Sequence, residues 1–165
     1  MPWIKPVKQQ NLKEYKIYEE LEKPVPIFNR MVAHSPDILE AFIPLQNAVK
    51  NTFLSDDYRE AIITYVSIKN GCEFCTKSHA TVLGELIGES EVVKKLTNYQ
   101  SEDWDEKLKS ILNYAEKLTS KPVSVTKEDI TQMQSHGYRE KEIFEINQVV
   151  AYTTYTNQMS VGLGL

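Results

Sequence analysis

The sequence predicts an all-α protein with short connections between its helices. Most of the chain falls into segments whose apolar residues recur at the three- and four-residue spacing of one helix face. Residues that start or stop helices, mainly serine, threonine, proline and glycine, bound these segments. No segment shows a convincing alternation of apolar and polar residues, which is the pattern typical of a strand.

The N-terminal segment, residues 1–30, is rich in proline. Its prolines are Pro2, Pro6, Pro24 and Pro26, with Pro36 just beyond. Proline lacks the backbone donor that a helix interior needs. We therefore expect an irregular arm around one short helix near residues 11–22.

The first long helix is predicted in "HSPDILEAFIPLQNAV", with Ser35 as N-cap and Pro36 at the first helical position. Pro44 should bend it. The next helix follows Ser55 in "SDDYREAIITYVSIKNG", where acidic residues occupy the first turn and Asn70-Gly71 provides the stop.

Residues 72–88 are predicted to form a further helix that ends at Gly88, and Ser90 caps a short helix after it. A longer amphipathic helix should end before Pro122. Its apolar face comprises Trp104, Leu108, Ile111, Leu112, Ala115 and Leu118. Thr126 and Asp129 start the next helix. The last long helix lies in "REKEIFEINQVVAYTTYTNQM".

Length and composition predict one domain over residues 1–165, because 41% hydrophobic and 25% charged residues are ordinary values for a globular protein. The net charge of -4 argues against nucleic acid as a partner. We find neither an apolar core of signal-peptide length nor an uncharged membrane-spanning run, so we expect a cytoplasmic protein without a membrane partner. In a reducing compartment, closely spaced thiols are more often catalytic or metal-binding than a structural disulfide.

The stretch "NGCEFCTKSH" contains both cysteines of the chain, Cys72 and Cys75, followed by His79. On a helix these positions share one face. The start of a helix stabilises a thiolate at Cys72, and His79 lies one turn beyond Cys75, close enough to exchange a proton with it. The three-residue spacing also allows one cysteine to trap a sulfenic acid on the other as a disulfide.

Glu60 is the acid expected to lie behind this imidazole. It is the one acidic residue within the apolar stretch "YREAIITYVSI" of the preceding helix. If the turn at Asn70-Gly71 folds the two helices against each other, Glu60 can approach His79, fix its tautomer and support a proton relay.

Other interpretations of these residues stay open. The cysteines could be an inert pair facing the core. A structural zinc site would need a fourth ligand from Glu60, His34 or His136, and the chain has no second Cys-x-x-Cys. An iron–sulfur cluster would need still more cysteines.

The order of Glu60, Cys-x-x-Cys at residues 72–75 and His79 resembles the alkylhydroperoxidase D (AhpD) group of the carboxymuconolactone decarboxylase-like family. The stretches "HSPDILEAF", "ILNYAEKLTSKPVSVTKEDI" and "HGYREKEIFEINQVVAYTTYTNQ" are similar to its peroxidase-related branch. The resemblance covers about residues 25 to 164.

This resemblance implies an AhpD-like helical bundle that works as a homo-oligomer, commonly a trimer or hexamer. It implies reduction of small hydroperoxides without haem, metal or other cofactor. By the same resemblance, Glu60, Cys72, Cys75 and His79 are the catalytic residues, with Cys75 as the attacking thiol and Cys72 as its resolving partner. The helix dipole alone would have favoured Cys72 as the attacking thiol. An external dithiol, in related proteins a lipoyl-bearing partner or a peroxiredoxin, would reduce the resulting disulfide.

Two positions depart from the family pattern. Founding members have a histidine where this chain has Phe74, and the branch often has Asn-Arg where this chain has Asn157-Gln158. Both departures leave the substrate and the reductant open. The alternative functions are a general disulfide reductase, a decarboxylase-type relative, or a non-enzymatic module that binds zinc or senses redox state.

Overall fold

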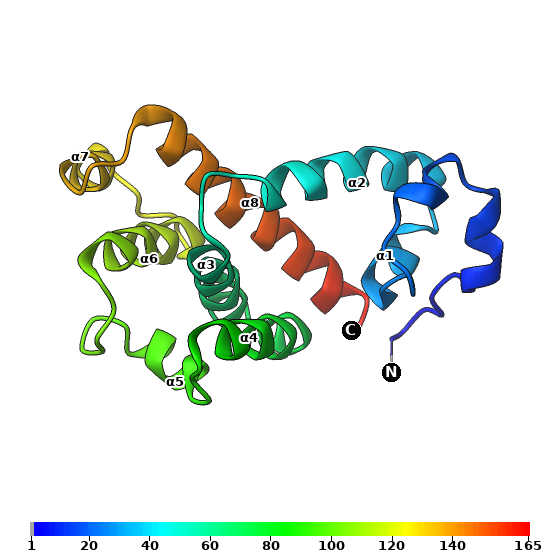
Figure 1. Cartoon of the computed structure of the whole chain (residues 1–165), viewed down its shortest axis with the longest axis horizontal. Coiled ribbons are helices and arrows are strands. Elements are labelled where there is room, and N and C mark those ends of the chain that lie inside the picture. The colour runs from blue at the N-terminus through cyan, green and yellow to red at the C-terminus, as the bar shows by residue number, and fades with distance from the viewer. Residues whose placement is uncertain (1) are drawn as a thin grey trace. The chain divides into compact units, whose positions relative to one another are not determined.

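A computed structural model describes residues 2–165 of the chain. Over these residues it contains eight α-helices, two 3-10 helices and no strand (Figure 1), which confirms the all-α prediction. None of the helices in this described range has the length and apolar character needed to cross a bilayer.

The elements follow the expected order after residue 35. They are η1 (Gln9–Glu14), η2 (Lys16–Glu20), α1 (Ile27–Val32), α2 (Pro36–Lys50), α3 (Asp56–Lys69), α4 (Glu73–Ile87), α5 (Val92–Thr97), α6 (Glu106–Thr119), α7 (Lys127–Ser135) and α8 (Glu140–Gly162).

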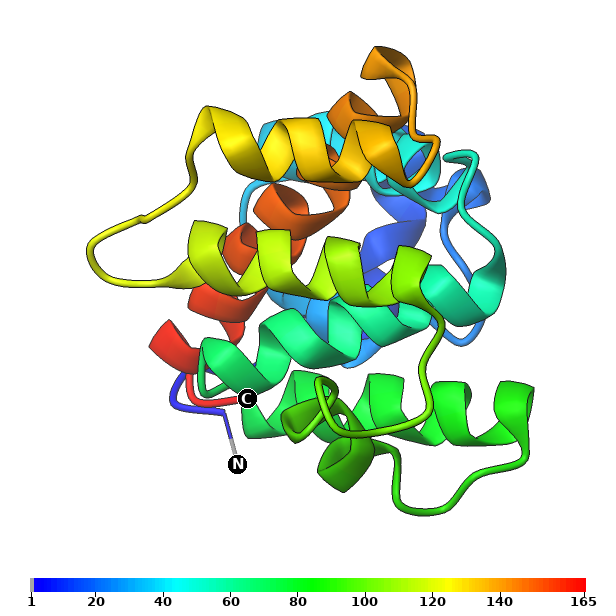
Figure 2. The same cartoon turned by 90° about the vertical axis from the view of Figure 1, so that its left-hand side faces the viewer.

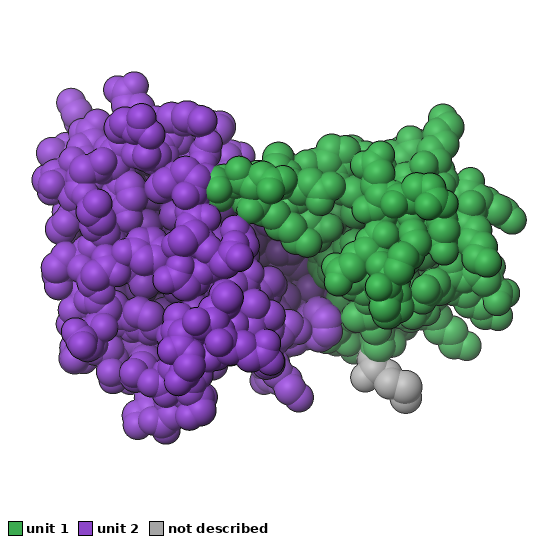
Figure 3. All heavy atoms as spheres, viewed as in Figure 1, with its two compact units in different colours: residues 1–52, 162–165 green, residues 53–161 purple. Residues whose placement is uncertain are grey.

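Contacts divide the described chain into two compact units (Figure 3). The first contains the chain up to residue 52 together with residues 162–165, and the second contains residues 53–161. The helices that bear Glu60, both cysteines and His79 all belong to the second unit.

The N-terminal segment is part of the first unit. It forms two short 3-10 helices instead of one short helix, and their Leu12 and Ile17 side chains are buried. Backbone bonds tie it to neighbouring segments of the unit: Val7 donates to the Arg30 carbonyl (3.1 Å) and Trp3 to the Leu163 carbonyl (2.9 Å). The structure therefore does not display a separate proline-rich arm.

Helix α1 was not expected from the sequence. It spans six residues directly after Pro26, and a segment this short between prolines lacks the repeated apolar spacing that identifies a helix. Pro26 itself takes the N-cap position, where a missing N–H costs nothing.

In the second unit, α3 contacts α4, α5 and α6, as two views of the molecule agree (Figures 1 and 2). A helix with neighbours on several sides is buried around most of its circumference. Accordingly, α3 buries a long run of side chains, including polar ones: Glu60, Ala61, Ile62, Thr64, Tyr65, Val66 and Ser67.

The helix boundaries confirm some of the capping predictions and correct others. Thr126 and Asp129 form the expected capping box at α7. Helix α6 begins later than expected, because Asp105 accepts from the Leu108 N–H (3.0 Å) and caps it. Trp104 therefore lies before the helix and not on its apolar face. At α5 the N-cap is Glu91 in place of Ser90.

A cluster of polar side chains joins the end of α3 to α6. Lys69 donates to Glu116 (2.9 Å), and the Tyr99 hydroxyl donates to the other oxygen of the same carboxylate (3.1 Å). The hydrogen bond from Lys69 lowers the pKa of Glu116 below its ordinary value of 4.5; partial burial opposes this and the bond from Tyr99 adds to it. A carboxylate with a lowered folded-state pKa stabilises the native state above its unfolded pKa and loses this contribution as the pH falls through the folded value.

We therefore expect Glu116→Gln to lower the free energy of unfolding at about pH 7 by about 0.5–1 kcal/mol, the range of a half-exposed ion pair. The gap between wild type and variant should narrow as the pH falls below 4.5, since the wild-type carboxylate then becomes protonated. Urea unfolding of both proteins over this pH range measures the gap. Glu91→Gln, which removes an exposed pair with Lys94, is the control. A difference in unfolding free energy that stays constant with pH would contradict the lowered pKa of Glu116.

Candidate active site

The turn between α3 and α4 sets the geometry of the site. Gly71 has φ 68°, a left-handed conformation that costs glycine little and other residues more. The chain reverses there, and the Cys72 N–H donates to the Ser67 carbonyl (3.0 Å). Cys72 is then the N-cap of α4, as the predicted start of this helix required.

The acid and the imidazole come together across the two helices. His79 Nδ1 lies 2.6 Å from Glu60 Oε2, within hydrogen-bond distance. Glu60 is 9% exposed as a residue, while the His79 side chain is 38% exposed. The expected approach of Glu60 to His79 is thus confirmed as a contact. Its catalytic role remains a prediction.

This contact determines which nitrogen of His79 bears the hydrogen. An ionised carboxylate only accepts hydrogen bonds, so Nδ1 must donate to Glu60. In the neutral ring, Nε2 then has the free lone pair and can accept a proton from another group. His79 itself follows Cys75 by one helical turn on α4.

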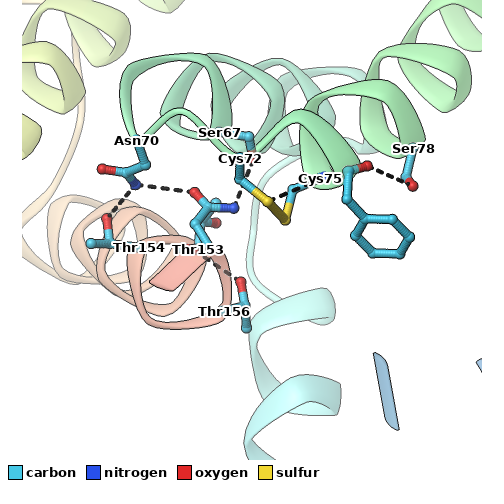
Figure 4. The surroundings of a disulfide bond; sticks show 10 residues. Ser67, Asn70, Cys72, Cys75, Ser78, Thr153, Thr154 and Thr156 are labelled. Atoms are coloured by element: carbon cyan, nitrogen blue, oxygen red, sulfur yellow. Dashed lines mark hydrogen bonds between the residues drawn. A yellow bond between two sulfur atoms is a disulfide. The ribbon is translucent and has the colours of Figure 1, made fainter. Parts of the chain in front are cut away.

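The two cysteines are joined as a disulfide (Figure 4). Cys72 is 1% exposed and Cys75 is 7% exposed. The Cys75 backbone N–H points at Cys72 Sγ (3.3 Å), so the first turn of α4 directs a donor at this sulfur. The pair is therefore in its oxidised state, and the helix start would stabilise a thiolate at Cys72 after reduction.

The other two histidines have different surroundings. His34 in the first unit is 2.9 Å from the Lys5 carbonyl through Nε2, and His136 is the C-cap of α7. Within residues 2–165 no group of three or more histidine, cysteine, aspartate or glutamate side chains is arranged to hold a metal ion.

Sequence reasoning did not identify a buried amide from α8 that is hydrogen-bonded to the end of α3. Asn157 is 1% exposed; its Nδ2 donates to Ser67 Oγ and its Oδ1 accepts from Asn70 Nδ2, both at 3.0 Å. A recognisable signal existed, because Thr153, Asn157 and Ser160 place polar residues at helical spacing on the buried side of α8.

A groove of about 850 Å³ runs along a different face of α4, between α4 and α5. Its lining includes Thr76, Ala80 and Gly84, at four-residue intervals, with Val92 and Val93 opposite. None of the four predicted site residues lines it. The groove is therefore distinct from the disulfide.

No known family model matches this sequence, and no curated protein is significantly similar to it. Solved structures are similar over the whole chain. An uncharacterized peroxidase-related protein from Ralstonia eutropha JMP134, described as an alkylhydroperoxidase AhpD core, has a TM-score of 0.85 at 22% identity, over 99% of this chain and 90% of that one. The chain has the AhpD-like fold.

Two other similar structures extend the comparison. An uncharacterized peroxidase-related protein from Silicibacter sp. TM1040 has a TM-score of 0.80 at 24% identity, covering 98% of this chain and 86% of that one. The debrominase Bmp8 has a TM-score of 0.84 at 17% identity, covering 98% and 90%. The AhpD-like fold therefore occurs both in peroxidase-related proteins and in a debrominase, and fold alone does not choose between these chemistries.

The Glu60–His79 contact makes a spectroscopic prediction. In the wild type at a pH where His79 is neutral, ¹⁵N NMR should give a protonated-type shift for Nδ1 and an unprotonated-type shift for Nε2. Glu60→Ala removes the acceptor at Nδ1, so the two tautomers should interconvert and both shifts should move toward intermediate values. His34 and His136 serve as internal controls, because neither contacts Glu60. A His79 spectrum identical in both proteins would contradict the contact.

Proposed function

We propose that this chain is a thiol-dependent peroxidase that reduces hydroperoxides through the Cys72–Cys75 pair. The observation that best supports the proposal is one helical hairpin that contains a closed cysteine pair together with a carboxylate–imidazole contact. A peroxide-reducing site needs these components: a thiol, a resolving thiol and a proton acceptor. The AhpD-like fold of peroxidase-related proteins adds support.

In the proposed cycle, Glu60 holds the Nδ1–H of His79, and Nε2 takes the proton of the Cys75 thiol. The thiolate attacks the peroxide O–O bond, the sulfur keeps one oxygen as sulfenic acid, and the departing alkoxide takes the proton from His79 and leaves as an alcohol. The Cys72 thiol then attacks the Cys75 sulfur, which forms the disulfide and releases water. An external dithiol restores both thiols by disulfide exchange.

We assign the attack to Cys75 for two reasons. Cys75 is the more exposed of the two cysteines, 7% against 1%, and a peroxide must reach the attacking atom. His79 also lies four residues after Cys75 on the same helix, which places the two side chains on one face. Cys72 at the helix start is suited to the second step, because it only has to reach a neighbouring sulfur.

We also propose the partners that this chemistry needs. The reductant is an external dithiol, either a lipoyl-bearing protein or a peroxiredoxin, in a reducing compartment such as the cytoplasm. The working form is a homo-oligomer, a trimer or hexamer. Exposed apolar side chains in the second unit, among them Val82 and Leu86 on α4 and Phe144 on α8, favour association of copies.

Peroxide turnover tests the function directly. With cumene hydroperoxide and dihydrolipoamide, we expect steady turnover by wild type and none above background by Cys75→Ser. His79→Ala should lower the rate by about 100-fold or more, the usual contribution of a positioned acid–base group. Ser78→Ala, on the exposed side of α4, is the control and should match wild type.

Cys72→Ser distinguishes the roles of the two thiols. It should consume about one equivalent of peroxide and stop, because the sulfenic acid on Cys75 has no resolving thiol. Dimedone labelling followed by mass spectrometry should locate the sulfenic acid at Cys75. If wild type and both cysteine variants consume peroxide equally slowly, the peroxidase assignment is wrong. Turnover of disulfide substrates alone would favour a general disulfide reductase.

Reductive debromination is a second candidate, because a debrominase shares the fold and a cysteine-to-alanine variant of it has been solved in complex with 2,3,4-tribromopyrrole. The electron balance suits the same pair: two thiols give two electrons and become a disulfide, the carbon–bromine bond becomes carbon–hydrogen, and bromide and a proton leave. Bromide release from 2,3,4-tribromopyrrole, without peroxide turnover, would favour this chemistry.

The zinc alternative is tested by metal analysis with a thiol count before and after chelation.

A further inference from the structure

We propose that Asn157 is a positioning residue for the redox pair: it fixes the α3–α4 turn so that Cys72 stays within reach of Cys75 when the disulfide is open. The proposal rests on redox cycling of this pair, which is part of the proposed function. It goes beyond that function because Asn157 lies on α8, far along the chain from the cysteines, and acts on them through Ser67 and Asn70.

The clamp consists of hydrogen bonds between one buried amide and two residues at the end of α3, where the turn begins. Asn157 Nδ2 donates to Ser67 Oγ before the turn, and Asn157 Oδ1 accepts from Asn70, the C-cap of α3 (both 3.0 Å). Asn70 also donates to Thr154 Oγ1 (3.2 Å), a second point of attachment to α8 (Figure 4). Amide oxygen and nitrogen are therefore both used, which also fixes which way the amide points.

The clamp is linked to Cys72 through the backbone. Ser67, whose hydroxyl receives the Asn157 bond, accepts the Cys72 N–H with its carbonyl (3.0 Å). One residue thus connects α8 to the first residue of the redox pair. Asn157 is 1% exposed and Ser67 is fully buried, so water does not compete for these bonds and their loss would leave buried groups unpaired.

The chemical consequence concerns the reduced state. In the disulfide form, the S–S bond itself limits the freedom of the turn. In the dithiol form that limit disappears. The first turn of α4 still holds the two cysteines near each other, and the clamp adds to their effective concentration by fixing Cys72 through the Ser67 carbonyl. Without Asn157 the dithiol gains conformational entropy that the disulfide does not, so the equilibrium should shift toward the dithiol.

The experiment equilibrates the whole chain in glutathione buffers of defined ratio and counts free thiols by maleimide mass-tagging. The exchange balances as dithiol plus oxidised glutathione giving disulfide plus two reduced glutathiones. We expect Asn157→Leu, which keeps the volume and removes both bonds, to shift the constant at least tenfold toward the dithiol, a rise in potential of about 30 mV. Ser67→Ala should shift it in the same direction by less.

Thr153→Val is the matched control: it is buried on the same helix, and its hydroxyl donates to the Val149 carbonyl of α8 itself (2.7 Å). Its constant should stay within twofold of wild type. A merely structural role for Asn157 would destabilise both redox forms equally and cancel in this equilibrium. The potential therefore separates positioning from general stability.

Each outcome decides the proposal. A shift of less than tenfold for Asn157→Leu, or a shift no larger than Thr153→Val gives, overturns it. If Asn157→Leu does not fold, the equilibrium constant of Ser67→Ala decides the proposal instead, because this substitution removes only the hydroxyl that accepts from Asn157 and hardly changes the side-chain volume. Peroxide turnover is measured separately. If the wild type does not reduce hydroperoxides but its dithiol–disulfide equilibrium still depends on Asn157, the proposed function is refuted and the positioning role of Asn157 is retained.

Discussion

The reversal of the chain at Asn70–Gly71 is the constraint on which the rest of the site depends. It turns α4 back against α3, and this packing is what allows an acid on α3 to meet an imidazole on α4. It also makes Cys72 the residue at which a helix starts. The left-handed conformation of Gly71 permits the tight reversal, and the buried face of α3 fixes the rotation of that helix, so Glu60 cannot turn outward without exposing Ile62 or Val66.

Several polar side chains are buried in this hairpin although apolar ones would pack as well. A buried carboxylate loses its hydration and must recover that free energy from a partner, which His79 supplies for Glu60. Ser67 and Asn157 satisfy one another in the same way. Buried polar pairs are seldom more stable than apolar replacements of equal size. The occurrence of two such pairs on the helices that flank the cysteine pair therefore favours a chemical explanation over a purely structural one.

The sequence predicted the helices of the second unit well, because each has a periodic apolar face and a recognisable start or stop. It also predicted the approach of Glu60 to His79, since a single acid in an apolar helix needs a partner and the next helix offered one. It failed for α1 and for the number of N-terminal 3-10 helices, where short segments between prolines have no periodic signal. It also failed for Asn157, because a hydrogen bond between residues 90 apart in the chain depends on how α8 crosses α3.

The two sulfurs occupy environments suited to different steps of the proposed cycle. At Cys72 the start of α4 stabilises the thiolate form, whereas burial to 1% exposure disfavours any charged form, so the two effects on this thiol oppose each other. That opposition does no harm to a resolving thiol. Its electrophile, the sulfenic acid on Cys75, forms three residues away, and prompt formation of the disulfide competes with further oxidation of that intermediate by a second peroxide. The attacking thiol has the opposite requirement, since it must meet a peroxide from solvent and release a proton. Cys75, more exposed and one turn before a solvent-accessible imidazole, meets it better than Cys72.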